Sequence, residues 1–143
     1  MRFMVMMITS NDAPDLLNPE KGAVPDEKIL TDMMRYNEEL IDAGVMLSGE
    51  GLHPTAKGAR ITYPGGKPTV TDGPFPEAKE VLGGFWLWQV QSKQEAIDWA
   101  LRCPAGEGAI LELRQVQESE DFGPEIARME DELRERIARY ATG

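Results

Sequence analysis

The run of residues 2–8 constrains the fold most, because it is apolar at nearly every position. Successive side chains of a β-strand point to opposite faces of the sheet, so both faces of a strand here would be apolar. Helices that cover one face would leave apolar side chains exposed on the other, and this pattern predicts a sheet that is covered on both faces. One series is Phe3, Val5 and Met7, and the other is Met4, Met6 and Ile8.

The order of the remaining predicted elements indicates the fold class. Two helices each follow a strand and cross back to another strand, with hairpin strands between them. This order is typical of a ferredoxin-like α+β fold with an antiparallel sheet and both helices on one face. A capping box at Ser92 begins the second helix, and Gly44 suits the end of the first. We expect strands over 2–8, 45–52, 59–63, 68–71, 84–90 and 109–116, helices over 26–43, 93–103 and 124–140, a loop over 9–25 and a turn over 64–67.

The second apolar face of the sheet needs cover that the two helices do not provide. The strand predicted over 84–90 repeats the pattern, with Trp86 and Trp88 on one face and Phe85 and Leu87 on the other. The simplest cover is the same face of a second subunit. We therefore expect a homodimer in which two sheets pack as a dimeric α/β barrel.

We divide the chain into a ferredoxin-like domain, residues 1–117, and a C-terminal helical extension, residues 118–143. Apolar residues of the extension recur at spacings of three and four, which places them on one stripe of a helix. The stripe needs a surface to pack on, and the sequence leaves open whether this subunit or a partner supplies it. It consists of Ile126, Met129, Leu133, Ile137 and Tyr140.

Composition excludes several classes of function. One histidine and one cysteine cannot supply the four ligands of a zinc finger, and Cys103 is expected to be a packing residue. A net charge of -10 and a pI of about 4.6 argue against nucleic acid as a partner. No run of about 18 apolar residues occurs, so we expect no membrane span. The expectation is a cytoplasmic protein without a metal or another cofactor.

Three segments together carry a specific motif. They are Gly49-Glu50-Gly51-Leu52-His53-Pro54, the stretch from Val70 to Glu80 that contains Asp72-Gly73-Pro74-Phe75, and Leu82-Gly83-Gly84-Phe85. Over residues 1–117 the chain resembles the YCII-related proteins, specifically their DGPF branch. The resemblance implies a dimeric ferredoxin-like barrel of largely uncharacterised activity. It also implies that His53 and Asp72 match a proposed catalytic His–Asp pair, and it makes an extracytoplasmic-function sigma factor a candidate partner.

The residues themselves support a role for His53, the one histidine of the chain. Imidazole titrates nearest to neutral pH, and His53 follows a strand end bracketed by glycines, where loops often carry function. If Asp72 accepted a hydrogen bond from one ring nitrogen, it would fix the tautomer and make His53 a general base. Two alternatives stay open. Asp72 could bond its own turn amides, and His53 could bond the backbone.

Three further residues are candidates for substrate binding. Arg60 could hold a carboxylate or phosphate, or pair with Glu50 across strands. Lys79 could contact an anion or form an ion pair with Asp72. Phe75 could stack on a ligand or plug the core.

Two functions of different classes fit these candidates. An enzyme without a redox cofactor would hold a small organic substrate in a cavity closed by the dimer, with His53 as the acid–base group. Asp72 would orient His53, while Arg60 or Lys79 would place an anionic group. A ligand-binding or regulatory module would instead sense a small molecule and contact a partner such as a sigma factor. A purely structural dimer, with a barrel interior filled by side chains, is the third alternative.

Overall fold

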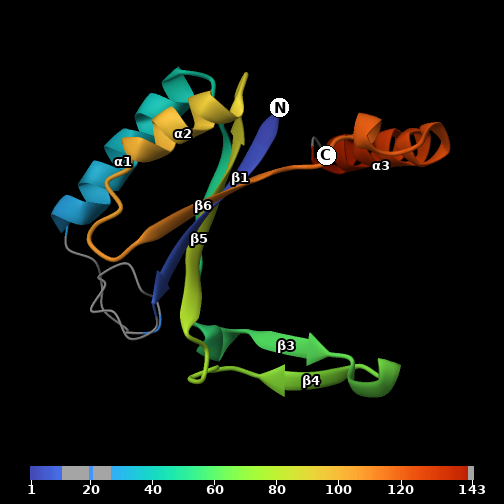
Figure 1. Cartoon of the computed structure of the whole chain (residues 1–143), viewed down its shortest axis with the longest axis horizontal. Coiled ribbons are helices and arrows are strands. Elements are labelled where there is room, and N and C mark those ends of the chain that lie inside the picture. The colour runs from blue at the N-terminus through green and yellow to red at the C-terminus, as the bar shows by residue number, and fades with distance from the viewer. Residues whose placement is uncertain (11–19, 21–26, 142–143) are drawn as a thin grey trace.

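The computed structural model describes residues 1–10, 20 and 27–141, and a four-stranded antiparallel sheet lies at its centre. The strands have the order β2-β5-β1-β6, and α1 and α2 lie on one face (Figure 1). This arrangement confirms the ferredoxin-like α+β fold. Most of the loop expected over 9–25 lies outside the described residues. The bounds are β1 Arg2–Ser10, α1 Glu27–Asp42, β2 Met46–Gly51, β5 Glu80–Gln89, α2 Lys93–Leu101 and β6 Ile110–Gln115.

Local signals end and begin the helices where the sequence predicts. Gly44 has a φ of 71°, a left-handed conformation that glycine adopts without steric cost after α1. The Ser92 hydroxyl accepts a hydrogen bond from the Glu95 N–H at 3.0 Å, and the Glu95 carboxylate accepts one from the Gln91 N–H at 2.7 Å. These contacts satisfy backbone donors at the start of α2 that have no partner within the helix.

The covered face of the sheet, the one beneath the helices, forms the hydrophobic core. Trp88 and Val5 are fully buried there, and the Trp86 ring packs against Tyr36 and Trp88 at centroid distances of 6.1 and 5.9 Å. The Tyr36 hydroxyl donates to the Trp99 carbonyl at 2.6 Å, which ties α1 to α2. The buried core consists of Phe3, Val5, Met7, Tyr36, Leu40, Val45, Trp86, Trp88, Val90 and Ala96.

The opposite face, which we call the open face, carries apolar side chains next to Glu112 and Arg114 of β6, and it has no described helix over it (Figure 1). The strand register pairs Met4 with Leu87 and Met6 with Phe85, which places all four on this face. Such a face is typical of an interaction surface. Its apolar residues are Met4, Met6, Ile8, Leu82, Phe85, Leu87 and Ile110.

Between β2 and β5 the chain leaves the sheet and forms a separate hairpin, which we call the arm. The arm consists of β3 (Ala59–Thr62) and β4 (Thr69–Asp72), and the turn predicted over 64–67 joins them. Gly65 and Gly66 have positive φ angles of 61° and 83°, which the turn requires. β5 begins at Glu80, four residues before the predicted start, because its ladder with β1 continues past a bulge.

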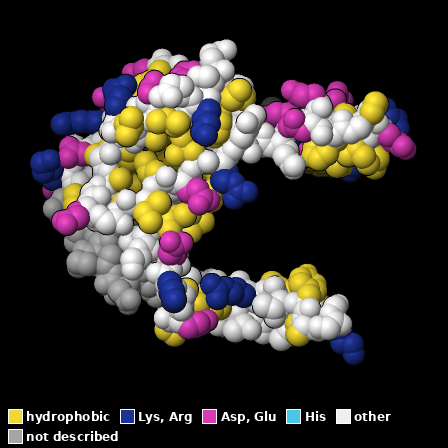
Figure 2. Space-filling model, viewed as in Figure 1, with side chains coloured by type: hydrophobic (Ala, Val, Ile, Leu, Met, Phe, Trp, Pro, Cys, Tyr) yellow, Lys and Arg dark blue, Asp and Glu magenta, His cyan; other side chains and the backbone are white. Residues whose placement is uncertain are grey.

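The C-terminal helix α3 (Pro124–Ala141) confirms the predicted helix and projects away from the sheet. None of its residues is buried, and its apolar stripe is between 49% and 81% exposed. Figure 2 shows that α3 and the arm border a hollow on one side of the molecule, with apolar side chains of α3 turned toward it. The surface that the stripe needs is therefore not supplied by the described part of this subunit.

Polar contacts fix the base of α3. The Arg2 guanidinium donates to both carboxylate oxygens of Glu118, at 2.7 and 3.0 Å. This hydrogen-bonded contact with Arg2 lowers the pKa of the Glu118 carboxyl. Glu118 also lies 4.0 Å from Arg134 of α3, and Ser119 donates a hydrogen bond to Asp131. The helix is thus attached through charged side chains, which leaves its apolar stripe free.

Candidate functional site

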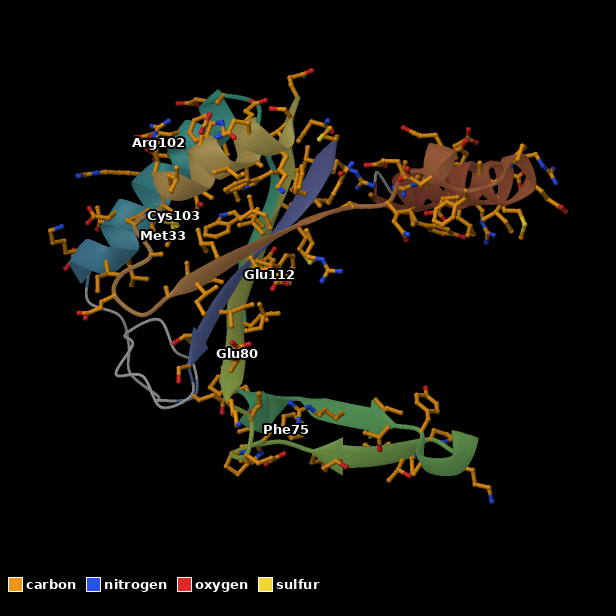
Figure 3. All side chains as sticks on the ribbon, viewed as in Figure 1. Met33, Phe75, Glu80, Arg102, Cys103 and Glu112 are labelled. Atoms are coloured by element: carbon orange, nitrogen blue, oxygen red, sulfur yellow. The ribbon has the colours of Figure 1, made fainter. Side chains whose placement is uncertain are left out.

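Three of the five predicted site residues meet at one cavity, which we call the arm-root cavity. It has a volume of about 570 Å³ and lies where the arm leaves β2 and β5. His53, Arg60 and Phe75 line it, together with Lys57 and Glu80. Figure 3 shows Phe75 at the root of the arm and Glu80 at the end of β5 nearest to it. The cavity combines apolar walls with side chains of both charges, as a site for a small polar organic molecule requires.

A hydrogen-bond network shapes this junction. The Thr55 hydroxyl and backbone N–H donate to the Glu20 carboxylate at 3.0 and 2.6 Å, and the hydroxyl accepts from the Phe75 N–H at 3.2 Å. A Cβ on Gly73 would lie 1.7 Å from the Thr55 carbonyl oxygen. The glycine of the Asp-Gly-Pro-Phe motif is therefore needed for close backbone packing.

The structure assigns Phe75 and Arg60 to a stacked pair. Phe75 is 7% exposed, and the Arg60 guanidinium lies 4.0 Å above its ring centroid, within the range of a cation–π contact. The expected alternative pair of Arg60 with Glu50 is replaced by one with Glu77, at 3.7 Å. Both Arg60 and Glu77 are largely exposed, so this ion pair stabilises little and leaves the guanidinium available to a ligand.

Asp72 and Lys79 are placed differently. In the arm, Asp72 pairs with Ala59 while Arg60 pairs with Thr71, so Asp72 and Arg60 lie on opposite faces of the hairpin. Neither Asp72 nor Lys79 is among the described residues that line the arm-root cavity. Among the described residues, the acidic one that lines this cavity is Glu80, which nothing in the sequence distinguishes from the other charged residues after the Gly-Pro turn.

A second cavity, the helix-side cavity, lies between α1 and the covered face and has a volume of about 290 Å³. The register places Gly51, Gly84 and Met7 in one row across β2, β5 and β1. Because two of these three positions lack a side chain, a hole remains beneath α1. Figure 3 shows Met33 on α1 above the sheet. The lining residues are Met7, Met33, Met34, Asn37, Gly49, Glu50, Gly51, Gly83, Gly84, Phe85 and Trp86.

The glycines that line this cavity differ in whether packing requires them. A Cβ on Gly49 would lie 2.7 Å from the Trp86 ring, and one on Gly84 would lie 2.9 Å from the Glu50 carbonyl oxygen. Packing therefore accounts for these two. A Cβ on Gly51 would meet nothing within 4 Å, so packing does not require a glycine there. Glycines in two separate segments of the sequence were the signal for this cavity, but only the strand pairing places Gly51 beside Gly84.

Asn37 is a polar residue of the helix-side cavity whose side-chain orientation is fixed by a hydrogen bond. The Trp86 indole N–H donates to the Asn37 side-chain oxygen at 2.9 Å. Because the side-chain oxygen of Asn37 accepts this bond, the amide nitrogen is the free end of the side chain. Its N–H groups have no hydrogen-bond partner among the described residues. The cavity thus offers an aromatic wall, flexible methionines and a hydrogen-bond donor.

Comparison with known proteins identifies the domain. A model of the YCII-related domain matches residues 1–120. The chain belongs to the YCII-related family. An uncharacterised protein of Rhizobium meliloti (strain 1021) is 36% identical over 75 residues, which span 52% of this chain and 60% of that protein.

The YCII-related match includes the sheet, α1, α2, the arm and both cavities, and it ends before α3.

Burial raises the pKa of the Cys103 thiol to about 12, which fits a packing role for this residue. Within residues 1–10, 20 and 27–141, no group of three His, Cys, Asp or Glu side chains could hold a metal ion. No helix in these ranges is long and apolar enough to cross a membrane.

Proposed function

We propose that this YCII-related protein binds a small, flat, largely apolar molecule in the helix-side cavity. The observation that carries the proposal is the glycine row, which leaves a hole between α1 and the sheet next to Trp86. Small-molecule sites are concave and mostly apolar, with a few placed polar groups. Because Asn37 presents a donor, the ligand carries a carbonyl or another hydrogen-bond acceptor.

Acetophenone, an aromatic ketone, tests this proposal against ethylbenzene, which lacks the acceptor. We expect acetophenone to bind more tightly and to shift the Trp86 indole N–H signal in NMR spectra, which a Trp86→Phe variant assigns. The Gly51→Val variant fills the cavity and should weaken binding at least about tenfold. Gly123→Val is the matched control, because Gly123 also has open space around it and lies outside the cavity. Equal binding by both variants contradicts the proposal.

A second function is acid–base chemistry on a small organic anion at the arm-root cavity. It is supported by the meeting of His53, Arg60 and Phe75 there. In this proposal His53 transfers the proton and Arg60 holds the anionic group. Asp72 stays the proposed orienting carboxylate from the family resemblance, and Glu80 is the alternative because it lines the same cavity.

NMR spectra of the imidazole nitrogens decide between the two carboxylates. A carboxylate that orients His53 fixes one neutral tautomer, so its removal should mix the tautomers. We would compare Asp72→Asn with Glu80→Gln and use Glu77→Gln as a control. If neither Asp72→Asn nor Glu80→Gln changes the tautomer ratio or the titration midpoint of His53, there is no dyad.

We also propose a homodimer in which two open faces pack together, since each presents seven apolar side chains without described cover. Sedimentation equilibrium tests the dimer. An extracytoplasmic-function sigma factor as a partner rests on the family resemblance alone. A pull-down that recovers only the protein itself counts against that regulatory role.

A further inference from the structure

The helix α3 lies outside the YCII-related match. Its apolar stripe is between 49% and 81% exposed in the described structure. In proteins most of the stability of a helix comes from tertiary packing of its apolar face. Its base is nevertheless held in place by Arg2 and Glu118, so the stripe has a defined direction. A positioned helix with an exposed apolar stripe is the structure expected of a docking element.

The arm is the other exposed element that borders the hollow, and it also carries apolar side chains (Figure 2). Ile61, Tyr63 and Val70 of the hairpin segment are 53%, 66% and 66% exposed. Within the subunit, the main contacts of α3 are with the turn at Ser119–Asp121. Both elements therefore have apolar surface for a partner.

Charge distinguishes which surfaces meet. Residues 118–143 contain eight acidic residues and four arginines, a net charge of -4. Residues 53–72, which include the arm, contain three basic residues and one acidic residue, a net charge of +2. Contact between two α3 helices or between two arms would bring like net charges together, whereas contact of α3 with an arm brings opposite charges together.

We propose that α3 docks on the arm of a second copy of this chain, and that two such contacts hold the dimer together. The proposal rests on the open-face dimer proposed above. α3 and the arm leave opposite ends of the sheet (Figure 1). When two open faces pack together, a two-fold axis that lies between the sheets and is perpendicular to the strands places each α3 beside the partner's arm. The interface is then isologous. The apolar stripe and the arm's apolar residues then cover each other.

A matched pair of substitutions tests the role of the stripe. Leu133→Glu places a charge in the stripe, and Leu101→Glu makes the same change at an exposed position of α2, on the other side of the sheet. We expect Leu133→Glu to weaken dimerisation roughly 100-fold or more in sedimentation equilibrium, because the loss occurs twice in a symmetric dimer. Leu101→Glu should leave dimerisation unchanged, and circular dichroism checks that both variants fold.

Cross-linking tests which surfaces meet. In a Cys103→Ala background, chains with Leu133→Cys and chains with Val70→Cys are treated with a flexible bismaleimide, mixed and separately. We expect the mixture to form cross-linked dimers and each variant alone to form few. Faster linking of Leu133→Cys chains to one another overturns the docking of α3 on the arm. If Leu133→Glu leaves the dimer unaffected, the docking of α3 on the arm is overturned and the open-face dimer stands. A monomeric wild-type protein overturns both proposals.

Discussion

Both faces of the sheet carry apolar side chains, but their surroundings are opposite, and the open face also holds the charged residues Glu112 and Arg114. Phe3 and Trp88 on the covered face are 3% and 0% exposed, whereas Met4 and Leu82 on the open face are 36% and 40% exposed. The chemistry also differs, because the tryptophans of β5 lie on the covered face and methionine and leucine prevail on the open face. Aromatic rings packed at fixed angles define one arrangement of α1 on the sheet.

The two faces therefore have different roles. The covered face holds the fold together within one subunit, while the open face and α3 present apolar surface that the described part of the subunit leaves unburied. Substitutions on the covered face should therefore change the stability of the subunit. Substitutions on the open face should change its association.

The largest effect is expected for Trp88→Ala on the covered face. Removal of a fully buried tryptophan leaves a cavity and should lower the free energy of unfolding by about 3–5 kcal/mol, measured by urea denaturation. Trp88→Phe should cost much less, because the indole N–H has no hydrogen-bond partner among the described residues and nothing polar is lost. A large loss in Trp88→Phe would show that the indole makes a contact that the packing does not reveal.

Leu87→Glu on the open face should have an effect that is smaller for each subunit and different in kind. Loss of the apolar contact removes about 1.5–3 kcal/mol of association free energy for each subunit, while the subunit stays folded. Sedimentation equilibrium measures the association, and urea denaturation of the monomer measures the fold. A variant that unfolds instead would mean that the open face belongs to the core of the subunit.

The contrast between the faces could be predicted from alternation in the sequence. Residues 2–8 and 84–90 indicated two apolar faces, and the helices were expected to cover only one. The order of the elements along the chain and the helix caps followed from local rules, because capping at Ser92 and the turn after α1 depend on neighbouring residues. The fold is thus largely encoded in local patterns.

The site was only partly predictable, because it depends on how separate segments meet. The motif led to His53 and Phe75, and the structure brings both to the arm-root cavity together with Arg60. It did not show that Asp72 faces away from Arg60, since that depends on the strand register of the arm. Nor could glycines in β2 and β5 reveal a cavity until pairing placed Gly51 beside Gly84.

A smaller effect is expected at Ser92, which begins α2 on the covered side. Ser92→Ala removes the acceptor for the Glu95 N–H and should lower the free energy of unfolding by about 1 kcal/mol. Ser92→Asp should restore most of it, because aspartate also caps helices and its charge suits a helix N-terminus. Thermal denaturation of both variants checks the cap, and equal loss in both would exclude it as the cause.

The smallest effect is expected at the base of α3, on the side of the open face. Arg2 lowers the pKa of Glu118 below its ordinary value of 4.5, so the ion pair stabilises the folded chain above that value. Its contribution, below about 1 kcal/mol for a partly exposed pair, is lost as the pH falls through the lowered pKa.

Other carboxyls titrate in the same range, so the informative quantity is the difference between wild type and Glu118→Gln. That difference in unfolding free energy should be present at pH 7 and vanish at acidic pH, whereas Glu120→Gln at an exposed carboxyl of the same turn should show little difference at either pH. If the docking of α3 depends on its fixed base, Glu118→Gln should also weaken dimerisation at pH 7. A Glu118→Gln protein that is less stable and dimerises normally would separate the attachment of α3 from its contact with the partner.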